Sequence, residues 1–335
     1  MKRKLKVGVV GATGMVGQTF MSILEDRDFP IAELRPFASE NSLGKKIELQ
    51  GQAWPVAILK EGCFDGLDLV FFSSGDDISK EWAPKAVKSG AFAIDNSAAF
   101  RMDPNTVLIV PEVNGHLVTK DSRPQIIANP NCSTIQLVVA LKPLADRFGL
   151  EEVRVSTYQA VSGAGQSGYD ELLEQTSMHS QPDQTAKTFP HTILFNCIPQ
   201  IGSFNDEGFC SEEVKIMTET RKILDQQKLK VSAFTVRIPA LNAHSESVWV
   251  TLNKAVSRDE VMSALSGFGG IVVQDEPKKS VYPLAREVSG KDPVYVGRVH
   301  RDPENPHMWM MWVVSDNIRK GAALNGIQIA ERIFF

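Results

Sequence analysis

The feature that most constrains the fold of this chain is a glycine-rich turn directly after its first apolar segment. Residues 5–11 (LKVGVVG) predict a short buried strand, and residues 18–24 (QTFMSIL) have the pattern of a helix. Between them, Gly11, Gly14 and Gly17 have the spacing G-x-x-G-x-x-G. Glycines at a strand–helix junction allow a tight turn, a close backbone approach to a pyrophosphate and close helix–strand packing. The pattern favours a dinucleotide-binding domain of the doubly wound α/β class over a plain glycine-rich turn.

The loop after the second predicted strand, residues 33–38, bears on the choice of cofactor. Folds of this kind that use NAD usually end this strand in an acidic residue that binds the ribose 2′-hydroxyl. Here Ser39 and Ser42 can donate to a 2′-phosphate, and Lys45 adds positive charge. Glu40 is a competing acid of the NAD type. The balance favours NADP, and a solvated polar loop is the alternative.

Further strands are predicted in the same sheet, and two polar residues follow them. The strands cover residues 67–72, 91–95 and 107–110. Ser73 comes directly after the first, and ligands lie at the carboxyl ends of such strands, so Ser73 is either a cofactor neighbour or a helix cap. Arg101 lies on a loop where its guanidinium can hold an oxyanion, and a surface salt bridge is the alternative.

A cysteine lies at the predicted start of a long apolar helix. A loop ends within residues 128–134 (ANPNCST), and apolar residues then recur over residues 135–144. Cys132 is therefore placed at a helix N-terminus, where backbone N–H groups and the helix dipole favour a thiolate and can stabilise an oxyanion. Ser133 and Thr134 are candidates to cap the same turn. A nucleophile and a buried structural cysteine both remain open.

The chain beyond Cys132 predicts a second α/β domain with a mixed, largely antiparallel sheet. An alternating strand over residues 153–161 ends in a turn, residues 162–165, that can approach a ligand closely. After a further strand, residues 231–239, come His244 and then Glu246. Alternate residues of a strand share a face, so Glu246 is expected to orient or polarise the imidazole.

The length of 335 residues suffices for two domains. We expect residues 1–131, together with a C-terminal helix at residues 315–335, to form the NADP-binding domain. Residues 132–314 are expected to form the catalytic and dimerisation domain.

Composition removes several classes of function. The net charge of −4 gives no reason to expect nucleic acid or an anionic membrane as a partner. No apolar stretch is long enough to span a bilayer, and the basic start lacks the apolar region of a signal peptide. The four cysteines lack C-x-x-C spacing, which argues against a disulfide framework and a zinc site. We expect a cytoplasmic protein without a bound metal.

A series of motifs in a fixed order extends over nearly the whole chain. They are residues 11–17, 97–101, 110–114, 129–134, 158–165, 212–215, Arg237 with His244, and residues 316–323. On these residues the chain resembles the aspartate-β-semialdehyde dehydrogenase family, bacterial type.

The resemblance implies a role for each matching residue. It makes Cys132 the nucleophile and His244 the acid/base, with Gln159 orienting the reacting groups. It makes Arg237 the ligand of the substrate carboxylate. It assigns the phosphate to Arg101, Asn131 and Lys215, with Glu212 positioning or binding nearby. The implied contacts with NADP are Gly11, Thr13, Gly14, Met15, Val16, Ser39, Ser73, Ser162, Gly163 and Asn317.

One position departs from the family pattern. Bacterial members often carry an arginine where Asn41 stands, and that arginine would stack on adenine and pair with the 2′-phosphate. Asn41 weakens the expected preference for NADP without removing it.

The implied reaction is the NADPH-dependent reductive dephosphorylation of L-aspartyl 4-phosphate to L-aspartate 4-semialdehyde through a cysteine thioester. This step feeds the synthesis of lysine, methionine, threonine and diaminopimelate, and the implied assembly is a homodimer, with a tetramer left open. One alternative is another acyl-phosphate reductase, of the N-acetylglutamyl-phosphate reductase type. Another is a non-catalytic dinucleotide-binding regulator, although the joint presence of Cys132, Gln159, Arg237 and His244 argues against it.

Overall fold

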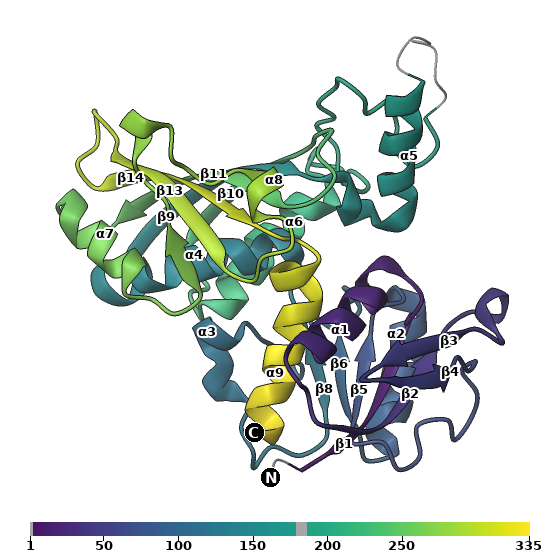
Figure 1. Cartoon of the computed structure of the whole chain (residues 1–335). Helices are drawn as coiled ribbons and strands as arrows, with labels where there is room; N and C mark the ends of the chain where they lie inside the picture. The colour runs from purple at the N-terminus through teal and green to yellow at the C-terminus, as the bar shows by residue number, and fades with distance from the viewer. Residues whose placement is uncertain (1–2, 179–185) are drawn as a thin grey trace. The chain divides into compact units, whose positions relative to one another are not determined.

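The chain folds into two units, each with its own sheet (Figure 1). The computed structural model describes residues 3–178 and 186–335. Unit 1 comprises Met1–Pro130 and Ala322–Phe335, and unit 2 comprises Asn131–Gly321.

The sheet of unit 1 has the strand order β2-β1-β5-β6-β8-β7. Its strands all pair in parallel. They are β1 (Leu5–Val10), β2 (Ile31–Phe37), β5 (Leu69–Phe72), β6 (Phe92–Asp95), β7 (Val107–Leu108) and β8 (Ile126–Ala128). A separate antiparallel pair consists of β3 (Lys46–Leu49) and β4 (Gln52–Pro55). The parallel order, with β1 inside the sheet, confirms the predicted doubly wound class.

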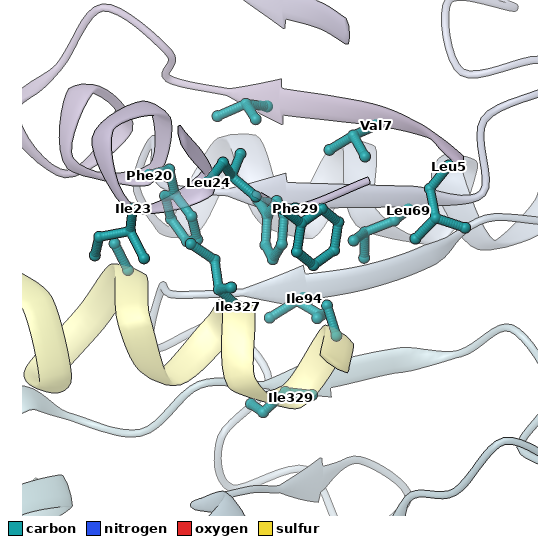
Figure 2. Close-up of a cluster of buried hydrophobic side chains, with 14 of the residues drawn as sticks. Leu5, Val7, Phe20, Ile23, Leu24, Phe29, Leu69, Ile94, Ile327 and Ile329 are labelled. Carbon is teal, nitrogen blue, oxygen red and sulfur yellow. The ribbon is translucent and has the colours of Figure 1, made fainter. Parts of the chain in front are cut away.

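Helices cover both faces of this sheet. α1 (Met15–Asp26) and α9 (Leu324–Phe334) share one apolar cluster with the strands, and α2 (Asp76–Lys88) belongs to the cluster on the other face. Figure 2 shows the first cluster, with Phe20 and Ile23 of α1 beside α9 (yellow). The short elements of unit 1 are η1 (Glu40–Ser42), α3 (Pro111–Asn114) and η2 (Gly115–Leu117). The C-terminal helix thus supplies part of the core of unit 1. Ile327 and Ile329 on its apolar side are buried in that core.

The sheet of unit 2 has the strand order β10-β9-β11-β14-β13-β12. The strands are β9 (Leu150–Gln159), β10 (Lys230–Arg237), β11 (His244–Leu252), β12 (Ile271–Val273), β13 (Val294–Arg301) and β14 (Met308–Ser315). β10 is parallel to β9 and β12 is parallel to β13. The other pairings are antiparallel, so the predicted mixed sheet is confirmed.

The helices of unit 2 carry much of the candidate site. α4 (Cys132–Phe148) packs against β11 and β14, and α6 (Ser211–Ile223) packs against β10 and α4. The remaining elements are η3 (Val161–Ala164), α5 (Gly165–Ser177), α7 (Arg258–Ser266), η4 (Pro277–Lys279), α8 (Ala285–Val288) and the π-helical turn η5 (Arg319–Ala323). Within residues 3–178 and 186–335, no helix is both long and apolar enough to cross a membrane.

Candidate active site

One edge of the unit 2 sheet collects three of the predicted site residues. The parallel strands β9 and β10 end at Gln159 and Arg237, which are register partners. β11 runs antiparallel to β9 and begins at His244 at the same edge. All three side chains are buried, so the sheet brings together polar groups that are far apart in sequence.

Cys132 is the first residue of α4, and its side chain is half-buried. The cap of this helix is Asn131, whose Oδ1 accepts the N–H groups of Ser133 (3.0 Å) and Thr134 (3.2 Å). The prediction that Ser133 or Thr134 caps the turn is therefore wrong, because the residue before the helix has the extended backbone that capping needs. These two N–H groups are also engaged and do not face an oxyanion. The half-buried position suits a nucleophile better than a sealed structural thiol.

Glu212 accepts hydrogen bonds from three neighbouring side chains. Its Oε1 accepts Nδ2 of Asn131 (2.8 Å) and Nε2 of Gln159 (3.0 Å). Its Oε2 lies 3.3 Å from Nζ of Lys215. Burial alone would raise the pKa of Glu212, but the Lys215 charge and the Asn131 and Gln159 donors outweigh burial and lower the pKa to about 2. The carboxylate is therefore ionised and holds these groups in place.

The amide of Gln159 has a defined orientation. Its Oε1 accepts the hydroxyl of Thr157 at 3.0 Å, while its Nε2 donates to Glu212. Exchanging O and N would place a donor against Thr157 and an acceptor against a carboxylate.

The imidazole of His244 is buried, neutral and oriented by the backbone. Its Nδ1 accepts the N–H of Ala160 at 3.0 Å, so the ring proton lies on Nε2. Among the described residues, Nε2 has no hydrogen-bond partner. Burial, and then the charge of Arg237, lower the pKa of His244 to about 3. The imidazole thus presents an N–H donor to the space beside it.

The prediction that Glu246 orients His244 is wrong. Neither carboxylate oxygen of Glu246 has a hydrogen-bond partner within the described chain, and Nδ1 of His244 is engaged by Ala160. Burial raises the pKa of Glu246 well above its ordinary value, and the amide of Gln136 on α4 opposes that shift. Burial therefore favours the uncharged form of the Glu246 carboxyl group.

This protonation state predicts how stability depends on pH. A carboxyl group whose pKa is raised on folding loses a proton more readily in the unfolded chain, so stability falls as pH rises above about 4.3, by at most about 1.4 kcal/mol per pH unit. We expect Glu246→Gln, which cannot ionise, to gain stability relative to the wild type as pH rises above about 5. Urea unfolding across this range measures the difference. The exposed Glu151→Gln is the control, and a difference for Glu246→Gln that stays constant with pH would contradict a protonated Glu246.

Arg237 lies next to His244 and to an exposed glycine. Its Nη1 donates to the carbonyl of Ala160 at 2.7 Å, and its Nε has no partner in the part of the chain that is described. A Cβ added to Gly163 would lie 2.7 Å from Nη1 of Arg237 and 3.2 Å from Nε2 of His244. Only a glycine therefore leaves both side chains accessible from this direction.

We expect Gly163→Ala to lower kcat/KM roughly 10- to 100-fold, because the added methyl group displaces His244 or Arg237 from the reacting geometry. Steady-state kinetics measure this loss. Gly269→Ala is the matched control, since a Cβ there meets no atom within 4 Å, and it should retain wild-type kinetics. Wild-type kinetics in Gly163→Ala would remove this glycine from the site.

Two further predicted residues, Ser162 and Asn317, lie together in unit 2. Nδ2 of Asn317 donates to Oγ of Ser162 at 3.0 Å, and its Oδ1 accepts the N–H of Ala243 at 2.9 Å. Close by in sequence, Gly321 approaches the nucleophile, because a Cβ on it would lie 2.9 Å from Cβ of Cys132. The segment that follows β14 thus borders the candidate site.

In unit 1, the predicted cofactor residues form the turn between β1 and α1. Gly11 has φ +82°, and a Cβ on it would lie 2.8 Å from the carbonyl of Ser73. The Ser73 hydroxyl donates to the carbonyl of Val10 at 2.9 Å. Gly14 precedes α1, and Met15 and Val16 form its first turn, where free N–H groups suit a pyrophosphate. The glycines thus allow a tight turn packed closely against its own backbone, and such a turn before a helix N-terminus fits a dinucleotide.

In the loop after β2, the two hydroxyls predicted to donate to a 2′-phosphate, those of Ser39 and Ser42, differ in exposure. Ser39 is exposed, as are Glu40 and Lys45, whereas Ser42 is buried, with its hydroxyl 3.3 Å from that of Thr13. Ser42 is therefore placed to support the glycine turn, and Ser39 is the more accessible of the two donors predicted for a 2′-phosphate.

For Arg101, the sequence left two roles open, an oxyanion ligand and a surface salt bridge, and the structure excludes the second. Its side chain is buried in unit 1, where Nε donates to the carbonyl of Asn129 and Nη2 to that of Asn96, both at 2.9 Å. The alternative of a surface salt bridge is wrong. These backbone carbonyls orient the guanidinium, whose N–H donors suit an anion.

Sequence reasoning missed two groups that support the site: the Ala160 N–H and Glu219. Oε2 of Glu219 accepts the backbone N–H of Asn131 at 2.7 Å. The one sequence signal that could have identified Glu219 as a site residue is its spacing: it lies two helical turns after Glu212, on the same face of α6. As to metals, the described residues contain no group of three His, Cys, Asp or Glu that could hold an ion.

Both units of the chain match the same family of known proteins. Residues 6–120 match the family model described as the NAD binding domain of semialdehyde dehydrogenase, and residues 141–320 match its dimerisation domain. The aspartate-semialdehyde dehydrogenase of Aquifex aeolicus is 48% identical over 97% of each chain. The solved structure of aspartate semialdehyde dehydrogenase II from Vibrio cholerae, complexed with ASA, has a TM-score of 0.95 at 41% identity, over 99% of this chain and 98% of that one. The enzyme from Candida albicans, solved with NADP, has a TM-score of 0.76 at 27% identity, over 99% and 98%.

Proposed function

Because this chain belongs to the aspartate-semialdehyde dehydrogenase family, we propose that it reduces L-aspartyl 4-phosphate with NADPH to L-aspartate 4-semialdehyde and phosphate. The observation that carries this proposal is the half-buried Cys132 in one unit with a neutral His244 and a buried Arg237. The product would serve the synthesis of lysine, methionine, threonine and diaminopimelate.

We assign the first bond change to Cys132. Its thiolate attacks the acyl carbon, the C–S bond forms, and the C–O bond to phosphate breaks with its electron pair leaving on phosphate. A thioester remains on Cys132. Its carbonyl is less stabilised by resonance than that of an ester and therefore accepts hydride readily.

We assign the acid/base role to His244. Its Nε2–H can donate to the oxygen of each tetrahedral species, in place of the helix N–H groups that Asn131 engages. When bound, the reduced nicotinamide supplies the hydride. As the last tetrahedral species collapses, its oxyanion re-forms the carbonyl, the C–S bond breaks and the thiolate is restored, while Nε2 of His244 keeps its proton and releases its hydrogen bond to the oxygen.

The substrate has two anionic ends, and we assign separate cations to them. Arg237, with its Nε unpaired in the described chain, suits the carboxylate. Lys215, Asn131 and Arg101 are proposed for the phosphate. Glu212 holds Lys215 and Asn131 and is proposed to position them together with Gln159.

For the cofactor, the family model supports NAD or NADP, and we propose NADP. Ser39 and Lys45 are exposed beside the turn and are proposed to meet the 2′-phosphate, while Thr13 to Val16 and Gly11 hold the pyrophosphate. Ser73, Ser162, Gly163 and Asn317 are proposed as further contacts. The ratio of kcat/KM for NADP and NAD measures the preference, and the Asn41→Arg variant should raise this ratio. A wild-type ratio that favours NAD would contradict the assignment.

We also propose a homodimer, on the basis of the dimerisation domain that residues 141–320 match. All four cysteines are free thiols, which suits a reducing compartment, and we propose the cytoplasm.

The decisive experiment follows phosphate-dependent reduction of NADP⁺ by purified protein with L-aspartate 4-semialdehyde or N-acetylglutamate semialdehyde. We expect turnover with the first and little with the second. The reverse preference would favour the other acyl-phosphate reductase. No turnover with either, together with slow alkylation of Cys132 that substrate does not prevent, would favour the non-catalytic regulator.

A further inference from the structure

Helix α6 carries a buried carboxylate that the proposed reaction does not use. Glu219 is 1% exposed, and its Oε2 accepts the backbone N–H of Asn131 at 2.7 Å. A carboxylate is rarely buried without strong donors, so this side chain has a local structural task. The task concerns the residue directly before the nucleophile.

Asn131 is held at three separate points. Its N–H is bound by Glu219, its Nδ2 by Glu212, and its Oδ1 by the N–H groups of Ser133 and Thr134. The bond to Glu219 fixes the peptide plane that enters the residue, and the side-chain bonds fix the turn that leaves it. Cys132 lies inside that turn, so its backbone has little freedom.

Helix α6 is itself tied to the strand that carries Arg237. The carboxylate of Glu213 accepts the N–H of Cys210 at 2.9 Å and that of Thr235 at 3.0 Å. Sγ of Cys210 also lies 3.0 Å from Oγ1 of Thr235. Helix α6, which holds Asn131, is therefore fixed against β10 at Thr235. Thr235 lies two residues before Arg237 in the chain.

We propose that Glu219 is a positioning residue for Cys132: through Asn131 it places the sulfur relative to Gln159 and Arg237. This inference rests on the proposed role of Cys132 as nucleophile. The bond to Glu219 holds the peptide directly before Cys132, so its loss would let this turn shift during thioester formation. Arg237, the proposed ligand of the substrate carboxylate, lies on β10 and is bonded to Ala160 rather than to Asn131.

The test compares Glu219→Ala and Glu219→Gln with the wild type. We expect Glu219→Ala to lower kcat roughly 10- to 100-fold per titrated Cys132 thiol, with KM for the semialdehyde changed less than about threefold. Glu219→Gln keeps an acceptor oxygen and should recover most of kcat. Asp275→Asn is the control, because Asp275 also accepts backbone N–H groups, from Arg298 and Val299, and its loss should lower Tm without changing kcat per thiol.

A second readout does not depend on activity. Hydrogen exchange of the Ser133 and Thr134 amides should quicken about tenfold in Glu219→Ala and stay at the wild-type rate in Asp275→Asn. Unchanged exchange, or faster exchange with kcat per thiol unchanged, would overturn the proposal. Inactive wild-type protein would refute the proposed function instead, and the exchange measurement would still report on Glu219.

Discussion

Replacing Cys132 by alanine should abolish phosphate-dependent oxidation of aspartate semialdehyde, with a fall in kcat on the order of 10⁴-fold or more. The thiolate forms the only covalent bond to substrate in the proposed reaction, and the Ser133 and Thr134 hydroxyls beside it are buried and far weaker nucleophiles than a thiolate. Water would have to replace it, which yields a carboxylic acid rather than an acyl phosphate. The measurement is NADPH formation at saturating semialdehyde and phosphate.

The control for this variant is Cys197→Ala, which removes an exposed free thiol from the same unit. It should keep wild-type kinetics. Both variants should also keep the Tm of the wild type within a few degrees, since Cys132 is half-buried at a helix end. Measurable phosphate-dependent turnover by Cys132→Ala would refute the thioester mechanism.

Replacing Arg237 by leucine should lower kcat/KM for aspartate semialdehyde on the order of 10³-fold, with KM raised and kcat lowered. Arg237 is 5% exposed, its Nη1 donates to the Ala160 carbonyl, and its guanidinium lies beside Gly163, as does the imidazole of His244. In such surroundings its charge is screened weakly by water, so an arriving carboxylate is bound strongly and at a defined angle. Arg237→Lys should recover only part of the activity, because a single ammonium cannot reach both Ala160 and a carboxylate with fork geometry.

Specificity for the carboxylate can be separated from general damage to the site. An aldehyde of similar length without a carboxylate should react slowly with the wild type, and Arg237→Leu should change that slow rate little. Arg154→Leu is the matched control, since Arg154 lies exposed on β9, where its guanidinium pairs with the carboxylate of Glu152. Equal losses on both aldehydes would show that Arg237 acts by holding the site together rather than by binding the carboxylate.

Several parts of the fold could be predicted because they depend on local rules. The turn at Gly11 needs a positive φ, and the closely packed Gly17 leaves no room for a Cβ beside the carbonyl of Gly11, so their spacing predicts a strand–turn–helix unit. The placement of Cys132 at a helix start follows equally from the apolar period after it. The doubly wound first sheet and the mixed second sheet follow from the order and the patterns of the strands.

Local rules were less successful for the contacts of individual polar groups. Ser133 and Thr134 have suitable side chains for a cap, yet the backbone geometry gives that role to Asn131. Glu246 shares a strand face with His244, yet the Ala160 N–H from a different strand end reaches Nδ1 first. In each case two groups of similar chemistry compete, and local sequence does not contain the distances that decide between them.

The glycine turn, the helix that begins at Cys132, the order of strands and the chemistry available to the site all follow from residues that are near one another in sequence. Three contacts come instead from the folded chain: Ala160 orients His244, Glu212 holds Gln159 and Asn131, and Glu219 holds the peptide before the nucleophile. Helix and strand periods and glycine torsions depend on neighbouring residues, whereas a hydrogen bond between distant residues depends on strand register and helix packing, which the whole chain sets together.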